Sequence, residues 1–585
     1  MPVYAVQQIE QGQRLIPFIP NKIGEELDAC SEIGGKERNK LKTFLQAQGI
    51  PSITEMDYSL REKFEQNLKD EQQLKQVSRY LLAYDRVKQY SIRQQMQTLS
   101  GRLQCQWKLE NKVLFLPYHP NQEIAVEFDS VRHRPNMVWD FTKLCSESLK
   151  KQIFLTLDAI IEQIKDMRKR ECRLTGLKYL YEFCAEHQIA DIEKLELDQI
   201  KEFECYLDEK TNNPRRKELL LPILNFCRQT VFLQNDKIHW DANVWYLERM
   251  NLPKHRVNES DSFRSVSFIE ITMPENRRYA QEFMKYQIGI TGQSLSTIVI
   301  KYNRIKQFLI WLCENGQIAC ECSEGQVNEY LQELQKRNII AKTFNECVTG
   351  ISQFYRLMIV HGHMERMPFH PEYYLKKVIR THHDRSVSTD ICTELLGKIY
   401  LLPEHLRCMY LHLWCLGLRI SEVCTLKGNA YYRKDNETWI KVYQIKMKTY
   451  KRIPIAEGLY KIMQVYIKRK HIGPDDYLFT NRNGGAYLTA TFREQMKRFC
   501  EIQGVDGGEY LFQSHDYRHT VATFFYDNGA SLQSVRDYLG HSYQEMTEQY
   551  IDYVPKKIAK ANDEYFKQPG HSLAAGLRKG GKHGG

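Results

Sequence analysis

Residues Ser514–Tyr553 read SHDYRHTVATFFYDNGASLQSVRDYLGHSYQEMTEQYIDY, a stretch with the apolar spacing of helices. Its side chains suited to chemistry on an anion are His515, Arg518, His541 and Tyr550. Because residues three positions apart share one face of a helix, we expect His515 and Arg518 to point the same way. Both side chains would then reach one anion.

Two upstream segments carry charged groups that need an explanation. Arg419 lies among apolar residues in LWCLGLRISEVCTL, where a permanently charged guanidinium requires a partner or a function. Residues 439–455, WIKVYQIKMKTYKRIPI, alternate polar and apolar positions. They predict a β-hairpin that turns near Thr449 and Tyr450, with lysines at its tip.

Together these groups suit the cleavage of a phosphodiester. Arginine matches phosphate oxygens bidentately and stabilises the extra negative charge of a pentavalent transition state. Histidine hydrogen-bonds those oxygens or moves a proton, lysine protonates a leaving 5′ oxygen, and tyrosine supplies a nucleophile. No cluster of metal-binding acidic residues accompanies them in the sequence. We therefore expect chemistry without a metal and without a cofactor.

The order and spacing of these residues resemble the signature of the tyrosine recombinase (phage integrase) family. The matching motifs are GLRISE at Gly417–Glu422, HDYR at His515–Arg518, LGH at Leu539–His541, and Tyr550, nine residues after His541. The resemblance covers about residues 385–565 and extends to SLSTIVIKYNRIKQFLIWL (Ser294–Leu312), which is similar to the start of the family's helical core-binding domain.

The resemblance implies a role for each matching residue. These residues are Arg419, Glu422, His515, Arg518, His541 and Tyr550. The two arginines would clamp the scissile phosphate, the glutamate would brace an arginine, and the histidines would assist. The tyrosine would attack the phosphate to give a 3′-phosphotyrosyl link and a free 5′ hydroxyl. Whether the tyrosine acts in cis or on a neighbouring protomer's site stays open.

The catalytic lysine has two candidates. Lys446 stands eight residues before Pro454, the family's usual distance, whereas Lys448 has the usual Lys-Thr context. Both are expected on the same face of the strand. The sequence does not choose between them.

The resemblance also implies a function and partners. We expect a site-specific recombinase or transposase that acts on double-stranded DNA through a Holliday junction, for the integration, excision or transposition of a mobile element. It would assemble on DNA as a homotetramer or with related recombinases. The alternatives are a type IB topoisomerase-like enzyme and a catalytically inactive DNA-binding regulator.

Composition agrees with a soluble protein that binds a polyanion. The 585-residue chain is 42% hydrophobic and 26% charged, with a formal net charge of +11. Its 16 cysteines form no CxxC pair and read as reduced thiols, which indicates a reducing compartment. The first residues lack the pattern of a secretory signal, and no stretch reaches the roughly 18 apolar residues of a membrane span. We expect a cytoplasmic protein that does not bind membranes.

An internal repeat organises the rest of the chain. Phe44–Leu68, Phe183–Leu207 and Leu312–Leu334 share the spacing of their apolar residues, although the third copy is two residues shorter. Three related helical modules are therefore predicted. Between the first two, residues 107–140 contain alternating segments bounded by prolines, such as VLFL and IAVEF, which predict a short hairpin or small sheet.

The predicted fold is mainly α and multi-domain: helical (SAM-like) modules precede an α+β catalytic domain with a small β-hairpin sheet. The predicted boundaries are 1–140 for a helical module with an inserted β segment, 141–270 for a duplicated helical module, 271–384 for a core-binding domain, 385–567 for the catalytic domain, and 568–585 for a disordered tail. Modules one and two are expected to bind further DNA or partner proteins.

Overall fold

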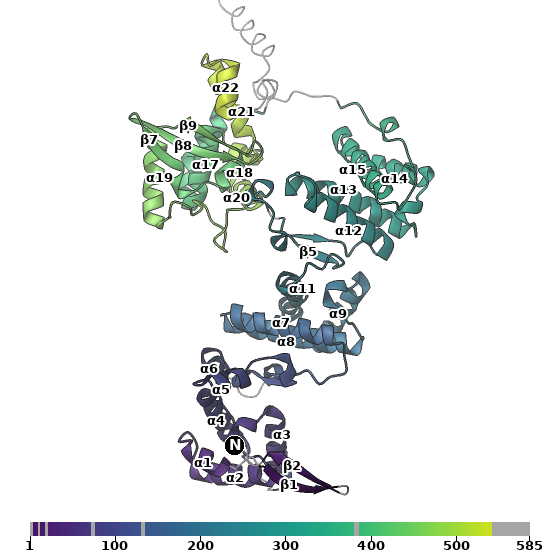
Figure 1. Ribbon diagram of the computed structural model, residues 1–585. Coiled ribbons are helices and arrows are strands. Elements are labelled where there is room, and N and C mark those ends of the chain that lie inside the picture. Colours follow the sequence, from purple (N-terminus) through teal and green to yellow (C-terminus); the bar gives the residue numbers. More distant parts are fainter. Residues whose placement is uncertain are drawn as a thin grey trace, which may run out of the picture. The chain divides into compact units, whose positions relative to one another are not determined.

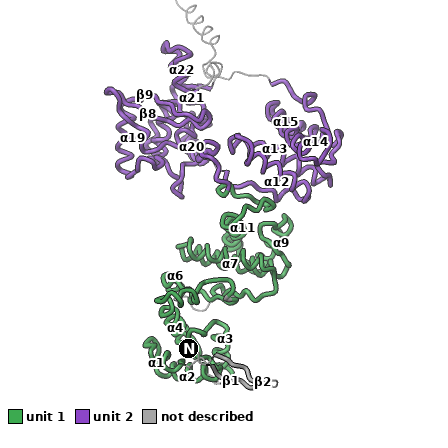
Figure 2. Tube along the Cα trace, viewed as in Figure 1, with its two compact units in different colours: residues 1–249 green, residues 250–585 purple. Residues whose placement is uncertain are grey.

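The computed structural model describes strands 4–9 and 12–17 and residues 22–71, 76–129, 135–261, 263–378 and 385–540. These residues are mostly helical, with small antiparallel sheets, as the sequence predicts (Figure 1). The chain divides into two compact units, Met1–Arg249 and Met250–Gly585 (Figure 2). The finer division into modules stays a prediction.

The first unit begins with a β-hairpin and a helical group. The hairpin pairs β1 (Tyr4–Ile9) with β2 (Gly12–Pro17). The helices that follow are α1 (Ile23–Ala29), α2 (Gly35–Ala47), η1 (Ile53–Glu55), α3 (Tyr58–Gln66), the π-helical η2 (Asn67–Glu71), α4 (Ser78–Gln95) and α5 (Leu99–Gln104). Apolar residues of these helices, among them Phe44, Phe64 and Tyr84, form one buried core.

The second half of this unit has its own core. Its elements are η3 (Leu109–Asn111), β3 (Val113–Phe115), η4 (Leu116–Tyr118), α6 (Gln122–Asp129), η5 (Pro135–Met137), β4 (Val138–Asp140), α7 (Glu147–Gln163), α8 (Met167–Glu186), η6 (Ile192–Lys194), α9 (Leu197–Lys210), α10 (Pro214–Leu220), α11 (Pro222–Gln234), β5 (Val244–Tyr246) and η7 (Leu247–Met250). Strands β3 and β4 pair antiparallel, so the predicted small sheet is present. The prediction of a strand at IAVEF is wrong. This segment lies in α6, where Ile124, Ala125 and Phe128 are buried at helical spacing.

The three repeat copies share one local structure. Each runs from a long helix through a 3-10 turn into a second helix: α2, η1 and α3; α8, η6 and α9; and, in the second unit, α13 (Leu295–Glu314), η9 (Ala319–Glu321) and α14 (Glu324–Lys336). Two residues after the first helix of each copy stands a residue with positive φ: Gly49, Gln188 and Gly316. Ring contacts recur, because Phe44 lies 4.9 Å from Phe64 and Phe183 lies 5.3 Å from Phe203. Common ancestry of the copies stays a hypothesis.

The second unit opens with a helical group. After η8 (Lys254–Arg256) and β6 (Ser265–Ser267) come α12 (Pro274–Gly289), α13, η9, α14, α15 (Ala341–Val360) and η10 (Pro371–Tyr373). Phe283, Phe308 and Phe354 are fully buried where α12, α13 and α15 pack together. Between η7 and α12 the described residues form η8 and the short strand β6.

The remaining elements form a mixed α and β region. They are α16 (Thr389–Lys398), η11 (Ile399–Leu401), α17 (Glu404–Leu416), α18 (Ile420–Cys424), η12 (Gly428–Ala430), β7 (Tyr431–Lys434), β8 (Glu437–Gln444), β9 (Thr449–Pro454), α19 (Glu457–Lys470), α20 (Thr489–Ile502), η13 (Val505–Gly508), α21 (Asp516–Asp527) and α22 (Leu532–Leu539). The strands form an antiparallel sheet in the order β7-β8-β9. Its inward side chains, such as Ile440, Val442 and Ile453, join the helices in one core.

The hairpin turns earlier than predicted. Gln444 pairs with Thr449, so the turn comprises residues 445–448, not Thr449 and Tyr450. Lys446 and Lys448 therefore both lie in the turn and do not share a strand face, which corrects that expectation.

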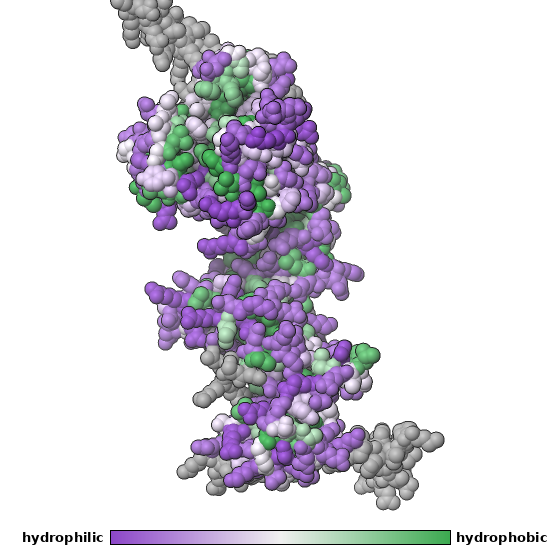
Figure 3. All heavy atoms as spheres, turned by 90° about the vertical axis from the view of Figure 1, so that its left-hand side faces the viewer, coloured by the Kyte–Doolittle hydropathy of each residue, from purple (hydrophilic) through white to green (hydrophobic). Residues whose placement is uncertain are grey.

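Hydrophilic side chains dominate the face drawn in Figure 3, with hydrophobic ones in smaller patches among them. All sixteen cysteines are free. Among the residues that the structure describes, no helix has the length and apolar character needed to cross a bilayer.

Candidate active site

A left-handed glycine places Arg419 at the start of α18. Gly417 ends α17 with φ +58°, and a Cβ at this position would lie 3.1 Å from Cβ of Val521 in α21. The chain then turns into α18 with Arg419 at the N-cap. Glycine in the GLRISE motif thus allows the left-handed turn at the end of α17 and the close approach of α21.

Glu422 holds Arg419 in a fixed position. One carboxylate oxygen accepts from the Arg419 backbone N–H at 3.0 Å and the other accepts from its Nη1 at 2.9 Å. Glu422 is only 2% exposed. Burial raises the pKa of Glu422, but the charges of Lys451, Arg518 and Arg419 outweigh it and lower the pKa overall. The carboxylate therefore stays ionised and orients the guanidinium.

Arg518 connects three segments that are far apart in the sequence. It lies in the first turn of α21 and is fully buried. Its Nη1 donates to the Gly417 carbonyl at 2.9 Å, and its Nη2 donates to the Leu539 carbonyl at 2.6 Å. The guanidinium thereby ties the GLRISE segment to the end of α22.

The end of α22 is where the LGH motif begins. Gly540 caps this helix with φ +69°, and a Cβ there would lie 2.2 Å from Nε2 of Gln444. Gln444, buried at the end of β8, donates to the Leu539 and Gly540 carbonyls, both at 3.3 Å. His541 and Tyr550 lie outside the described residues, but the chain leading to them leaves from this point.

Lys451 is a buried charge that the sequence did not single out. Its side chain, on β9, lies 3.4 Å from Oε2 of Glu422 and donates to the Leu539 carbonyl at 3.5 Å. Burial, partly offset by Glu422, lowers its pKa to about 8. The sequence did carry a signal for this burial. Lys451 stands two residues before the buried Ile453, so both side chains lie on the same face of β9.

The two predicted lysines lie in different surroundings. Lys446 has a lowered pKa, owing to burial of its ammonium and the positive charges of Arg419 and Arg518, although part of its side chain is exposed. Lys448 is exposed at the end of the turn with φ +55°. The positive charges of Arg419 and Arg518 thus act on the ammonium of Lys446.

His515 precedes α21 and faces the same positive cluster. Burial of its ring lowers its pKa to about 4, and the charges of His519, Arg518, Arg419 and Lys446 act in the same direction. The residue as a whole is nevertheless exposed to solvent. Its imidazole is neutral at pH 7, so it serves as a neutral hydrogen-bonding group in the free protein.

The arrangement collects positive charge around one buried carboxylate. Besides burial, the charges of Arg419 and Arg518 lower the pKa of Lys446 and Lys451, and together with Lys451 they lower the pKa of Glu422. Such a surplus of positive charge stabilises a bound anion and resists further protonation. Of the predicted site residues, the structure brings together Arg419, Glu422, Lys446, His515 and Arg518.

Comparisons with known proteins give a consistent identity for this region. Residues 391–556 match the family model described as "Phage integrase family". Transposase B from transposon Tn554 of Staphylococcus aureus is 25% identical over 326 residues, which cover 54% of this chain and 51% of that protein. The chain thus spans about half the length of these staphylococcal relatives. A tyrosine recombinase of Pseudothermotoga lettingae is 24% identical over 297 residues, 50% of this chain and 99% of that one.

Among solved structures, the Tn1549 transposon integrase in complex with transposon right end DNA is 18% identical and covers 49% of this chain and 98% of that one, with a TM-score of 0.37. The family match contains the GLRISE, HDYR and LGH motifs and the arginines that the structure brings together. Residues 391–556 of this chain therefore match the phage integrase family, and this match agrees with the resemblance of the motifs to those of tyrosine recombinases.

Proposed function

We propose that this protein cuts and rejoins DNA strands as a tyrosine recombinase that moves a mobile element. The observation that carries the proposal is the pair of hydrogen bonds from Arg518 to the Gly417 and Leu539 carbonyls. They unite the HDYR, GLRISE and LGH segments around the proposed anion-binding cluster. The similarity to transposase B from transposon Tn554 supports a role in transposition.

In the proposed reaction a DNA phosphate lies against Arg419 and Arg518. The Tyr550 oxygen attacks phosphorus, the tyrosine O–P bond forms, and the bond from phosphorus to the 5′ oxygen breaks. The tyrosine proton passes to a base, for which His515 is neutral and available in the free protein. Lys446 protonates the departing 5′ oxygen. Attack by a 5′ hydroxyl from a second strand reverses these steps and rejoins the DNA.

Glu422 and Lys451 would support this reaction by positioning the groups that bind the phosphate. Glu422 fixes the Arg419 guanidinium through two hydrogen bonds. Lys451 bridges Glu422 to the Leu539 carbonyl and so links the arginine to the start of the LGH motif. We assign both as positioning residues, since each acts through a neighbour.

The proposed partner is double-stranded DNA carrying the ends of an element, bound by several protomers or by related recombinases, in the cytoplasm. The net charge of +11 supports contacts to phosphates, and binding should weaken as salt rises. We propose that the first unit, Met1–Arg249, binds further DNA or a partner protein. A chain starting near residue 270 that recombines the same ends equally well would refute that role.

Covalent capture tests the proposed chemistry. The full chain is incubated with sheared genomic DNA from its source strain, and DNA that stays attached to protein after denaturation is sequenced. We expect enriched junction fragments that are lost in Tyr550→Phe and kept in Tyr543→Phe and Tyr553→Phe. An adduct that persists in Tyr550→Phe would refute the nucleophile. Relaxation of supercoiled DNA without site preference would favour the topoisomerase alternative.

A sulfur-substituted substrate separates the two lysines. Replacing the scissile 5′ bridging oxygen by sulfur makes a leaving group that needs no proton donor. We expect Lys446→Ala to cleave normal DNA slowly and the sulfur-containing DNA at nearly the wild-type rate. Lys448→Ala should cleave both at nearly wild-type rates, because Lys448 is exposed at the end of the turn. The reverse pattern would transfer the role to Lys448.

A further inference from the structure

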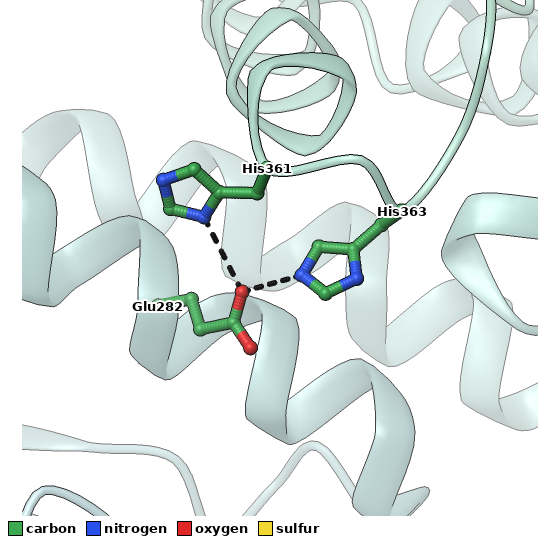
Figure 4. Close-up of side chains that lie close together, drawn as sticks. All are labelled: Glu282, His361 and His363. Atoms are coloured by element: carbon green, nitrogen blue, oxygen red, sulfur yellow. Dashed lines mark hydrogen bonds and ion pairs between the residues drawn. The ribbon is translucent and has the colours of Figure 1, made fainter.

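Two histidines and a glutamate converge in the helical group that opens the second unit. Glu282 lies on α12, whereas His361 and His363 follow the end of α15 (Figure 4). His363 Nε2 lies 2.6 Å and His361 Nδ1 lies 3.4 Å from the same oxygen, Oε2 of Glu282. One ligand atom from each of the three residues lies within 4.8 Å of the others.

A rigid turn presents the two imidazoles. The N–H of His363 donates to the Met358 carbonyl at 2.9 Å and the N–H of Gly362 donates to the Ile359 carbonyl at 3.0 Å, which is the Schellman pattern of a helix end. Gly362 has φ +77°, a conformation that favours glycine. The His-Gly-His sequence therefore sets both rings toward α12 by its backbone.

Neighbouring side chains orient the cluster further. The ring of Tyr279 lies 5.0 Å from that of His363, at an angle of 57°. Nε of Arg278 lies 3.8 Å from Oε1 of Glu282, whereas both histidines contact the other carboxylate oxygen, Oε2. Partners of this kind hold ligand rings and carboxylates in place around protein metals.

The donor set and its spacing fit a zinc ion. Zinc bonds of 2.0–2.2 Å to nitrogen and oxygen at tetrahedral angles put neighbouring ligand atoms about 3.3–3.5 Å apart. The His361 contact of 3.4 Å already has this length, and the His363 contact of 2.6 Å would open by less than an ångström on binding. Two histidines and one glutamate form a known zinc ligand set that leaves a fourth position for water.

We propose that Glu282, His361 and His363 bind a Zn²⁺ ion that fastens the end of α15 to α12. The half-buried Glu282 and His363 and the exposed His361 leave the site open for metal entry and for a water ligand. Its proposed role is to hold the chain just after α15 against α12, because Glu282 lies on α12 and both histidines follow α15. The proposal does not depend on the proposed recombinase chemistry.

Metal titration of the full chain tests the site. Untagged protein is stripped with a chelator, desalted, and titrated with Zn²⁺ against a chromophoric indicator. We expect the wild type to bind one equivalent of Zn²⁺ tightly. In His361→Asn, His363→Asn and Glu282→Gln the Zn²⁺ affinity should fall by more than the roughly 10–100-fold that removal of an outer partner costs. His370→Asn is the matched control, because His370 is exposed and lies 3.5 Å from a single carboxylate, Glu372.

Cobalt and hydrogen exchange give independent readouts. Co²⁺ should show tetrahedral visible bands without a thiolate charge-transfer band, since the ligands are nitrogen and oxygen. Zn²⁺ should slow amide exchange in peptides from 274–289 and 355–365 of the wild type but not of His361→Asn. His361 is exposed, so this variant should fold even if Glu282→Gln does not. Equal Zn²⁺ stoichiometry and affinity in the wild type and His361→Asn would overturn the proposal.

Discussion

The buried ammonium of Lys451 should make the stability of the catalytic region depend on alkaline pH. Its pKa falls from 10.5 to about 8 in the folded protein. Below about pH 8 both the folded and unfolded states hold the proton. Between about pH 8 and 10.5 only the unfolded state holds it, so the free energy of unfolding rises with pH across this window.

The size of the effect follows from the shift. A change of about 2.5 pH units at 1.36 kcal/mol per unit gives about 3 kcal/mol across the window. Lys451→Met keeps a side chain of similar length and has no proton to release. The variant should therefore lose this gain, so that the difference in stability between it and the wild type changes by about 3 kcal/mol.

Hydrogen exchange in the full chain measures this locally. The free energy of opening is followed in peptides from α18 and β9 between pH 7 and 10.5, corrected for intrinsic exchange. Lys441→Met is the matched control, because Lys441 lies on the neighbouring strand but is exposed. Its pH dependence should equal that of the wild type. Parallel curves for wild type and Lys451→Met through the window would refute the buried charge.

Two further predictions concern the glycine and the histidine of the motifs. Gly417→Ala should lower the free energy of unfolding by about 1–2 kcal/mol or more, because φ is +58° and the new Cβ meets Val521. Gly397→Ala, in open space on α16, should raise stability slightly, and thermal unfolding compares the two; equal shifts would contradict the strain. His515 should stay neutral from pH 8 to 5 in the free protein, since its pKa is about 4. Proton NMR of its ring would follow the midpoint, and addition of target DNA should raise it; a free-protein midpoint above pH 6 would contradict the burial.

The sequence alone was enough to predict the chemistry and the family match of residues 391–556, because the reactive residues keep fixed spacing along the chain. GLRISE, HDYR and LGH are short segments whose residue types follow from local needs, such as the left-handed φ at Gly417 and Gly540. Helical periodicity likewise predicted the mainly α fold. These features depend on neighbours in sequence, so the sequence displays them directly.

Tertiary structure decided what depends on contacts between distant segments. The buried position of Lys451 against Glu422 and Leu539 arises only when β9, α18 and α22 meet. The proposal of Lys446 over Lys448 as the catalytic lysine depends on the register of β8 and β9, which places the turn at residues 445–448, and on the charges of Arg419 and Arg518 that help to lower the pKa of Lys446. The proposed zinc cluster joins Glu282 of α12 to His361 and His363, which follow it by 79 and 81 residues and lie just after α15. No local pattern records such pairings, because long-range packing determines them.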